Sequence, residues 1–452
     1  MRPQKPAECP VRRPRLDAKE PQASRASSAS APPRVQSCST VLPARGAVLR
    51  TRQPRPEPHG RTGDPSALAP AAPRCSDRHL PRLGPARDDR EARRLRLRPE
   101  TVTTMPQENS SITPGQVWLD TSGQRIHAHG GSIIEVDDTF YWYGENKERS
   151  TPGSGVWHWG VRCYSSTDLY NWTDRGLIIP PVVEDVTSPL HPAMSMDRPH
   201  ILRHPVSGQY VCWIKVMSPI GQRSEVMVAD DILGPYRTER TGLLPLGMNA
   251  GDFDLVVDPT DGKGYYYFER VHSELICADL DADYTNVTGY YSTHFPLVQP
   301  PYVREAPAYF VRQGVHYLVT SGTTGYYPNP SQVANAPSYH GPWTVLNDPH
   351  PGDRTRSSYQ SQISSVFKHP HKQDLYIALA DRWLPRYSEH SDAAVRMHAE
   401  RFKPLGGHDD GPWSELTEID TSIADYVWLP FRFEDSGAFL DWQDEWRIED
   451  YA

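Results

Sequence analysis

The chain has 452 residues and a formal net charge of −8 at pH 7. That value combines a basic and an acidic part of the chain. Residues 1–100 hold 22 Lys and Arg against 10 Asp and Glu, whereas residues 101–452 hold 26 Lys and Arg against 46 Asp and Glu. No run of about 18 apolar residues occurs, which excludes a membrane-spanning helix. The Arg residues of the basic segment have no interleaved aromatic residues for base stacking, which disfavours nucleic acid as a partner.

Residues 1–104 differ in composition from the rest of the chain. The 12 Trp, 23 Tyr and 10 Phe all lie beyond residue 100. A segment without aromatic side chains buries too little apolar surface to offset its ordering entropy, so we expect a disordered Arg- and Pro-rich extension. Two interpretations stay open, namely a translated tail or sequence upstream of a start at Met105. Neither Met1 nor Met105 precedes an apolar signal-peptide core, so we expect a cytoplasmic protein, with secretion left open if the start is misassigned.

Beyond residue 113 one short pattern occurs five times, in which a polar residue precedes two apolar residues by four positions. The five polar residues are His129, Asp197, Asp252, Glu305 and Gln362. A turn and a second, aromatic-rich run follow each time, at 140–143, 210–213, 265–268, 316–319 and 375–378. Short aromatic and β-branched runs separated by Gly, Pro and Asp indicate strands.

The spacing of this pattern predicts the fold class. Successive polar residues are separated by 68, 55, 53 and 57 positions. A repeat of about 40–50 residues or somewhat more, built from short strands, is typical of propeller blades. The sequence therefore predicts an all-β fold, a five-bladed β-propeller, in one domain over residues 113–452. The tail around Val427 and Trp446 either completes the last blade or closes the ring against residues 117–119.

A propeller brings the first residues of its innermost strands together at one end of the axis. Here these residues include three carboxylates from three different blades, Asp197, Asp252 and Glu305. Like-charge repulsion and partial burial allow one such carboxyl group to stay protonated near neutral pH. Two carboxyl groups in different protonation states are what the hydrolysis of a glycosidic bond requires. The sequence thus predicts a glycosidase.

Several motifs occur in order along residues 115–390. They are Ala128-His129-Gly130-Gly131, Tyr141-Trp142-Tyr143-Gly144-Glu145-Asn146-Lys147, Asp197-Arg198-Pro199, Gly251-Asp252-Phe253-Asp254-Leu255, Glu305-Ala306-Pro307, Thr324-Gly325-Tyr326 and Ser361-Gln362. With these motifs the chain resembles glycoside hydrolase family 43, most closely the subgroup that contains exo-β-1,3-galactanases. The resemblance implies a five-bladed inverting enzyme that acts on plant polysaccharides.

The resemblance also implies roles for individual residues. Glu305 matches the general acid of the family, and Asp252 matches the aspartate that orients this acid and raises its pKa. The usual general base is an aspartate on the first blade, but Gly130 stands in that place here. In the galactanase-like subgroup a fifth-blade glutamine, matched by Gln362, is thought to hold the attacking water.

We expect the substrate to be an oligo- or polysaccharide, and specifically a neutral galactoside or pentoside. The residues expected to contact it are Asp197, Arg198, His129, Glu145, Thr324 and Tyr326. Asp197 stands where the subgroup has a glutamate, and Asp197 is shorter by one methylene. No metal ligands and no cofactor are predicted, and an axial calcium ion is not readable from the sequence.

Alternatives remain for three features. Asp254 is interpreted as a strand-start cap rather than a catalytic group. His129 is either a buried histidine satisfied by its surroundings or a ligand of an axial ion or water. The whole propeller is either an enzyme or a carbohydrate-binding module that has lost its base, and the retained pair of Glu305 and Asp252 favours the enzyme.

Overall fold

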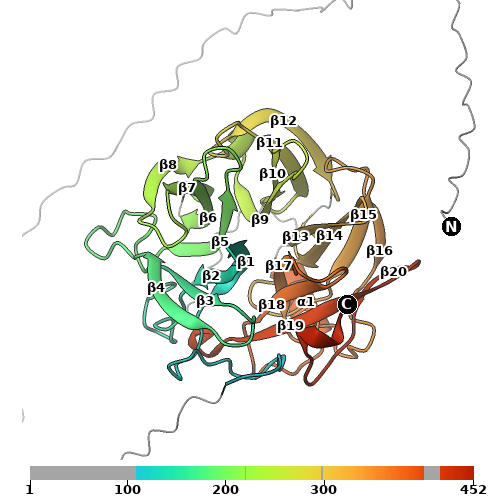
Figure 1. Cartoon of the computed structure of the whole chain (residues 1–452). Helices are drawn as coiled ribbons and strands as arrows, with labels where there is room; N and C mark the ends of the chain where they lie inside the picture. Colours follow the sequence, from blue (N-terminus) through green and yellow to red (C-terminus); the bar gives the residue numbers. More distant parts are fainter. Residues whose placement is uncertain (1–107, 219, 297–298, 402–417) are drawn as a thin grey trace, which may run out of the picture. The chain divides into compact units, whose positions relative to one another are not determined.

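The computed structural model describes residues 108–218, 220–296, 299–401 and 418–452. The predicted extension at 1–104 lies outside these residues. The described part is built almost entirely from strands, arranged as five four-stranded antiparallel sheets around one axis (Figure 1). This arrangement confirms the predicted five-bladed β-propeller. No helix within the described ranges is long and apolar enough to cross a membrane.

Each sheet is one blade, and its strands follow one another in sequence order from the axis outward. Blade 1 contains β1 (His129–Val136), β2 (Thr139–Glu145), β3 (Val161–Ser166) and β4 (Thr173–Ile179). Blade 2 contains β5 (Ser195–Arg203), β6 (Tyr210–Ser218), β7 (Gly221–Ala229) and β8 (Arg237–Leu243). Blade 3 contains β9 (Ala250–Val257), β10 (Gly264–Arg270), β11 (Glu274–Leu280) and β12 (Val287–His294).

The last two blades follow the same plan with one insertion. Blade 4 contains β13 (Arg304–Arg312), β14 (Val315–Gly322), β15 (Gln332–Ala336) and β16 (Thr344–Asn347). Blade 5 contains β17 (Gln362–Lys368), β18 (Tyr376–Arg382), β19 (Asp425–Glu434) and β20 (Gly437–Leu440). The helix α1 (Asp392–Arg401) lies between β18 and β19 in sequence, and short 3₁₀ turns occur at Pro245–Gly247, Thr421–Ile423 and Ile448–Asp450.

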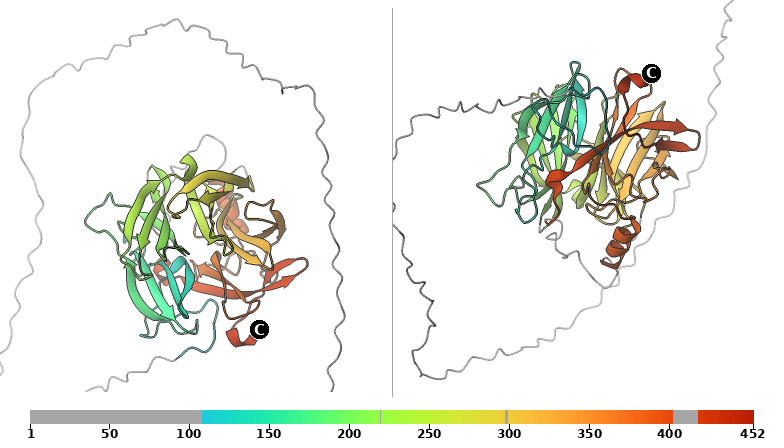
Figure 2. Two further views of the ribbon diagram at one scale, coloured as in Figure 1. Left: turned by 45° about the horizontal axis from the view of Figure 1, so that its top comes forward. Right: turned by 90° about the horizontal axis from the view of Figure 1, so that it is seen from below.

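The ring closes through its inner strands and through both ends of the described chain. Each of β1, β5, β9, β13 and β17 contacts the next, and β17 contacts β1. Ile112 and Trp446 exchange two backbone hydrogen bonds, of 2.9 and 3.0 Å. β19 completes blade 5, which was one of the two predicted roles of the tail. Trp446 pairs with Ile112 rather than with residues 117–119, whereas Trp428 of β19 contacts Trp118, with ring centroids 4.8 Å apart. Figure 2 shows α1 and the C-terminus at opposite ends of the propeller.

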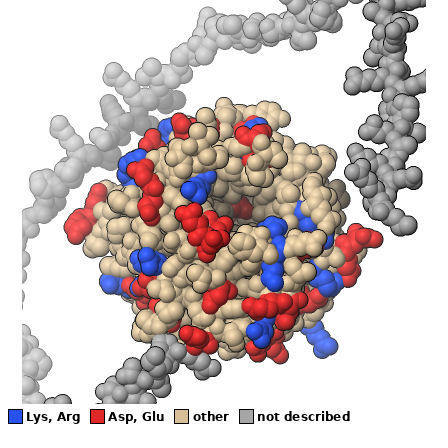
Figure 3. Space-filling view, in the orientation of Figure 1, with Lys and Arg blue, Asp and Glu red and all other residues tan. Residues whose placement is uncertain are grey.

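The core lies between blades, because the aromatic second strands are buried on both faces. Side chains alternate along a strand, so that neighbouring residues face different blades. Trp142 on β2 therefore packs against Trp428 of blade 5, with ring centroids 4.5 Å apart, whereas Tyr143 joins the cluster shared with blade 2. The ring remains hollow at its centre, with basic and acidic side chains interspersed around it (Figure 3).

All five inner strands carry a β-bulge close to their first residues. On β1, the pairs His129↔Glu145 and Ser132↔Tyr143 leave one extra residue on the inner strand, and the equivalent shift occurs on β5, β9, β13 and β17. Gly130, Arg198 and Ala306 adopt positive φ at these places. A bulge bends a strand and redirects a side chain. The repeated bulge therefore redirects side chains at the same end of all five inner strands.

Candidate active site

A cavity at this end of the axis is lined by side chains from all five blades. They include Glu145 from blade 1, Asp197 from blade 2, Asp252 from blade 3, Glu305 from blade 4 and Gln362 from blade 5. Arg198 and Tyr326 also line it. Seven of the nine predicted site residues are thus brought together.

Glu305 is a buried carboxyl group in the cavity wall. Its Oε1 atom lies 3.3 Å from Nε2 of Gln362, which donates a hydrogen bond to it. Burial, followed by the charges of Asp252 and Glu269, raises the pKa of Glu305 well above its usual value. Glu305 therefore keeps its proton at a pH where an exposed glutamate would lose it.

Asp252 differs from Glu305 in that two cationic side chains contact its carboxylate. Nζ of Lys215 lies 2.7 Å from Oδ1 of Asp252, and Nε of Arg198 lies 2.9 Å from Oδ2. Burial alone would raise the pKa of Asp252, but Arg198 and Lys215 lower it below its usual value. One carboxyl group is thus kept neutral and its neighbour ionised, which is the division that assigns acid and base roles in many hydrolases.

The amide of Gln362 has a fixed orientation. Arg198 donates from Nη2 to its Oε1 atom at 2.6 Å, and its Nε2 atom donates to Oγ of Ser321 at 2.9 Å as well as to Glu305. A carbonyl oxygen has two lone pairs, so Oε1 retains one acceptor position after the bond from Arg198. Gln362 is therefore able to accept a hydrogen bond from a water molecule but carries no basic group.

Asp197 is held by one hydrogen bond and one ion pair. Nε1 of Trp157 donates to Oδ1 at 2.7 Å, and Nζ of Lys215 lies 3.4 Å from Oδ2. Lys215 thereby bridges Asp197 and Asp252, and it lies opposite Asp197 in the register of β5 and β6. The lysine fixes these two carboxylates relative to one another.

Glu145 occupies the space that Gly130 leaves free. A Cβ atom on Gly130 would lie 2.4 Å from Oε1 of Glu145, so only glycine fits there without moving the carboxylate. Oε1 accepts from the backbone N–H of Arg198 at 2.9 Å, and Oε2 pairs with Nζ of Lys147 at 2.8 Å. Burial raises the pKa of Glu145 to about 7 even though Lys147 opposes this shift.

Two predicted contact residues, His129 and Thr324, do not line the cavity. His129 is fully buried, with Nδ1 3.0 Å from Asp381 and Nε2 3.3 Å from the hydroxyl of Tyr426. Burial lowers its pKa well below the usual value, so His129 is neutral. These contacts agree with the interpretation of His129 as a buried histidine whose ring nitrogens both have polar partners.

Thr324 is also fully buried, and its hydroxyl donates to the carbonyl of Tyr327 and accepts from Asn329. Its neighbours Thr323, Gly325 and Tyr326 form the cavity wall instead.

Asp254 on blade 3 does not line the cavity but connects neighbouring blades. It accepts a hydrogen bond from the backbone N–H of Tyr309 on blade 4 at 2.6 Å, and it lies 2.9 Å from Nδ1 of His200 on blade 2.

Sequence reasoning missed Lys215 and Glu269, both of which line the cavity. Glu269 is buried, accepts from the backbone of His272 at 2.8 Å, and lies against Gly251, where a Cβ atom would be 2.2 Å from its Oε2. A signal was present, because a polar residue follows each of the five aromatic-rich runs within three positions. These residues are Glu145, Lys215, Glu269, Ser321 and Asp381.

Within the described part of the chain, no group of three or more His, Cys, Asp or Glu side chains is arranged to hold a metal ion. The cavity wall offers the cationic side chains of Arg198 and Lys215, the oriented amide of Gln362, and five carboxyl groups, those of Glu145, Asp197, Asp252, Glu269 and Glu305. Aromatic rings complete the wall, with Tyr326 5.7 Å from Trp157 and 5.1 Å from Trp383 between ring centroids. Such a combination of apolar faces and a few polar groups is typical of a site for a small polar ligand.

Comparison with known proteins adds independent information. Residues 126–395 match the sequence model of the family described as glycosyl hydrolases family 43. A search of curated proteins gave no significant match.

The chain is similar to many solved structures, among them the following three. A family 43 β-1,3-galactosidase has a TM-score of 0.60 and 26% identity, over 76% of this chain and 64% of that one, so the chain spans less than two thirds of that relative. A second family 43 β-1,3-galactosidase, solved with galactodeoxynojirimycin, has a TM-score of 0.59 and 28% identity, over 75% of this chain and 100% of that one. An exo-β-1,3-galactanase from Clostridium thermocellum has a TM-score of 0.57 and 27% identity, over 74% of this chain and 66% of that one.

Proposed function

The chain belongs to glycosyl hydrolases family 43, and on that premise we propose that it hydrolyses β-1,3-linked galactosides with inversion at the anomeric carbon. The observation that carries the proposal is the pair formed by Glu305, whose pKa is raised, and Asp252, whose pKa is lowered. A carbohydrate-binding module has no need of a carboxyl group kept neutral. The choice of galactose over a pentose is supported by the similar structures, which include two β-1,3-galactosidases and an exo-β-1,3-galactanase.

In this proposal Glu305 is the general acid. The bond between the anomeric carbon and the leaving oxygen breaks, and the proton of Glu305 passes to that oxygen. Asp252 stays ionised, held by Lys215 and Arg198, and burial together with the charge of Asp252 keeps Glu305 protonated.

Water forms the new bond from the opposite face of the sugar ring. The remaining acceptor position on Oε1 of Gln362 takes one hydrogen of that water, and Arg198 and Ser321 hold the amide in place. Asp197 either accepts the proton that the water loses or binds a hydroxyl of the sugar, in which case that proton passes to solvent water. The aromatic rings of Trp157, Tyr326 and Trp383 contact the apolar faces of the sugar.

A panel of disaccharides and aryl glycosides tests the proposed function. The full-length chain is expected to release galactose from β-1,3-galactobiose and from aryl β-galactosides, and to act at least about ten-fold more slowly on arabinofuranosides and xylosides. Binding of the galactosides without any release of galactose would favour the carbohydrate-binding alternative.

The pH profile tests whether Glu269 acts on Glu305 through its charge. Glu269→Gln removes a neighbouring negative charge, so the pKa of Glu305 falls and the alkaline limb of kcat/KM moves to lower pH. Glu225→Gln is the matched control, because Glu225 is also buried and hydrogen-bonded, to Gly242 at 2.6 Å, but does not line the cavity. An unchanged limb in Glu269→Gln would show that this carboxylate is structural.

A further inference from the structure

The connection between blades 4 and 5 has an unusual backbone conformation. It comprises residues 348–361 and leads directly into Gln362, the first residue of β17. Within it Arg356, Ser358, Tyr359 and Gln360 have φ values of 53°, 55°, 55° and 63°. Left-handed conformations are unfavourable for residues with a side chain, and three in succession persist only where the surroundings impose them.

Asp353 imposes this conformation from within the loop. Its Oδ1 atom accepts from N and Oγ1 of Thr355 at 2.9 and 2.6 Å. Its Oδ2 atom accepts from the backbone N–H groups of Ser357 at 2.6 Å and Tyr359 at 3.0 Å. One carboxylate thus fixes three residues that lead into the left-handed turn at 358–360.

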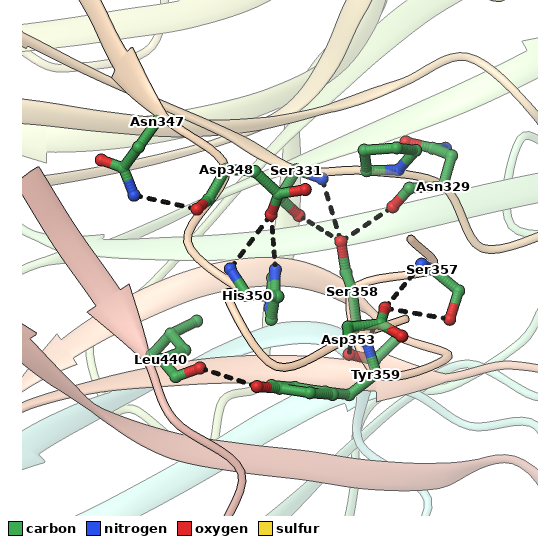
Figure 4. A network of polar contacts seen from close by, with 12 residues as sticks. Asn329, Ser331, Asn347, Asp348, His350, Asp353, Ser357, Ser358, Tyr359 and Leu440 are labelled. Carbon is green, nitrogen blue, oxygen red and sulfur yellow. Dashed lines mark hydrogen bonds and ion pairs between the residues drawn. The ribbon is translucent and has the colours of Figure 1, made fainter. Parts of the chain in front are cut away.

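Ser358 attaches the same turn to blade 4, as Figure 4 shows. Its side chain is almost fully buried, donates to the carbonyl of Asn329 at 2.8 Å and accepts from the backbone of Ser331 at 2.9 Å. Asn329 in turn binds both backbone groups of Gly322, at 2.7 and 2.8 Å. Gly322 follows Ser321, whose hydroxyl accepts from Nε2 of Gln362.

The opposite side of the turn is attached to blade 5. The hydroxyl of Tyr359 donates to the carbonyl of Leu440 at 3.2 Å, and Arg382 donates to the carbonyl of Tyr359 at 2.9 Å. The turn therefore spans both blades directly ahead of Gln362. A shift of this turn changes where the amide of Gln362 lies between Arg198 and Glu305.

We propose that Asp353 and Ser358 are positioning residues that hold the turn 358–360 and thereby fix the amide of Gln362 in the cavity. The proposal rests on the proposed function in so far as Gln362 orients the attacking water. Neither residue lines the cavity, so both act through Gln362.

Two full-length variants test the proposal, each with a crystal structure and steady-state kinetics. Ser358→Gly removes the hydroxyl and leaves the buried N–H of Ser331 without this acceptor, which lowers stability, but glycine tolerates positive φ, which offsets part of that loss, so the variant should remain folded. Asp353→Asn keeps one acceptor oxygen, so in either orientation of the amide its NH₂ group faces a backbone N–H, that of Thr355 or those of Ser357 and Tyr359. In both variants the amide of Gln362 should leave hydrogen-bonding distance of Ser321 or Arg198, and kcat should fall about 10- to 100-fold with little change in KM.

Asp258→Asn is the matched control. Asp258 makes the same pair of bonds to N and Oγ1 of Thr260, at 2.8 and 2.6 Å, but in the turn between β9 and β10 and away from the cavity. Its kcat should stay within about two-fold of the wild type. In a Gln362→Ala background Ser358→Gly should cost no further activity, because the effects of two substitutions do not add when one residue acts only through the other.

The outcomes separate this proposal from the proposed function. A Gln362 amide that stays in place in both variant crystals overturns the proposal, as does a displaced amide with unchanged kcat or a full additional loss in the Gln362→Ala background. If the wild-type chain cleaves no galactoside, the proposed function fails, whereas the position of the amide in the two variants still decides whether Asp353 and Ser358 hold it.

Discussion

Glu305→Gln is expected to lower kcat on β-1,3-galactobiose by about 10²–10⁴-fold, because the leaving sugar then receives no proton from the enzyme. Aryl galactosides with acidic phenols need less protonation, so their hydrolysis should fall much less. Binding of galactose should persist, since the amide keeps the shape of the carboxyl group and still faces Gln362. Steady-state kinetics on both substrates measures this difference.

Glu225→Gln serves again as the control for loss of a buried carboxyl group remote from the cavity, and it should retain wild-type rates on both substrates. Equal losses on galactobiose and on the activated aryl galactoside would show that Glu305 does not act as the acid. A wild-type rate on galactobiose would remove Glu305 from the reaction altogether.

The same variant has a predicted effect on stability. The pKa of Glu305 is raised in the folded protein, so the folded state binds this proton more tightly than the unfolded state does. The resulting contribution to stability is fully present below the usual glutamate pKa and is lost as the pH rises through the folded-state value. Glu305→Gln does not titrate, so its melting temperature relative to the wild type should increase with pH. A difference that is constant across the range would contradict the raised pKa.

Asp197→Asn separates the two roles open to this residue. If Asp197 accepts the proton of the attacking water, kcat falls by about 10²–10⁴-fold and azide restores turnover by forming the inverted glycosyl azide. If Asp197 instead binds a sugar hydroxyl, KM rises and azide has no effect. Product analysis by mass spectrometry at several azide concentrations distinguishes the two results.

Gln362→Ala provides the comparison for Asp197→Asn. Azide needs no proton acceptor but still needs a site, so the variant that lacks the orienting amide should be rescued poorly. Full activity in both Asp197→Asn and Gln362→Ala would place the attacking water elsewhere in the cavity.

The positions of the inner strands were predictable because their signals are local. A polar residue four positions ahead of two apolar ones, followed by an aromatic run, depends on side-chain alternation within one hairpin. His129, Asp197, Asp252, Glu305 and Gln362 accordingly all lie at or near the start of an inner strand. The bulges were not predictable, since a bulge is a property of two paired strands rather than of one run of residues.

The surroundings of individual side chains were harder to predict. His129 starts an inner strand, but its partners Asp381 and Tyr426 lie 252 and 297 residues away in sequence. Contacts at such separations leave no pattern that one sequence can show. Lys215 was missed for a different reason, because it lies within an otherwise apolar run on β6 and its role depends on the register that places it opposite Asp197.

The stereochemistry of the first product tests the central claim most directly. The full-length chain should be mixed with β-1,3-galactobiose in an NMR tube, and the anomeric proton signals followed from the first minutes, before mutarotation equilibrates the released sugar. Single displacement by a water held by Gln362, with protonation by Glu305, predicts that α-galactose appears first. The appearance of β-galactose first, or the absence of any released galactose, would contradict the account.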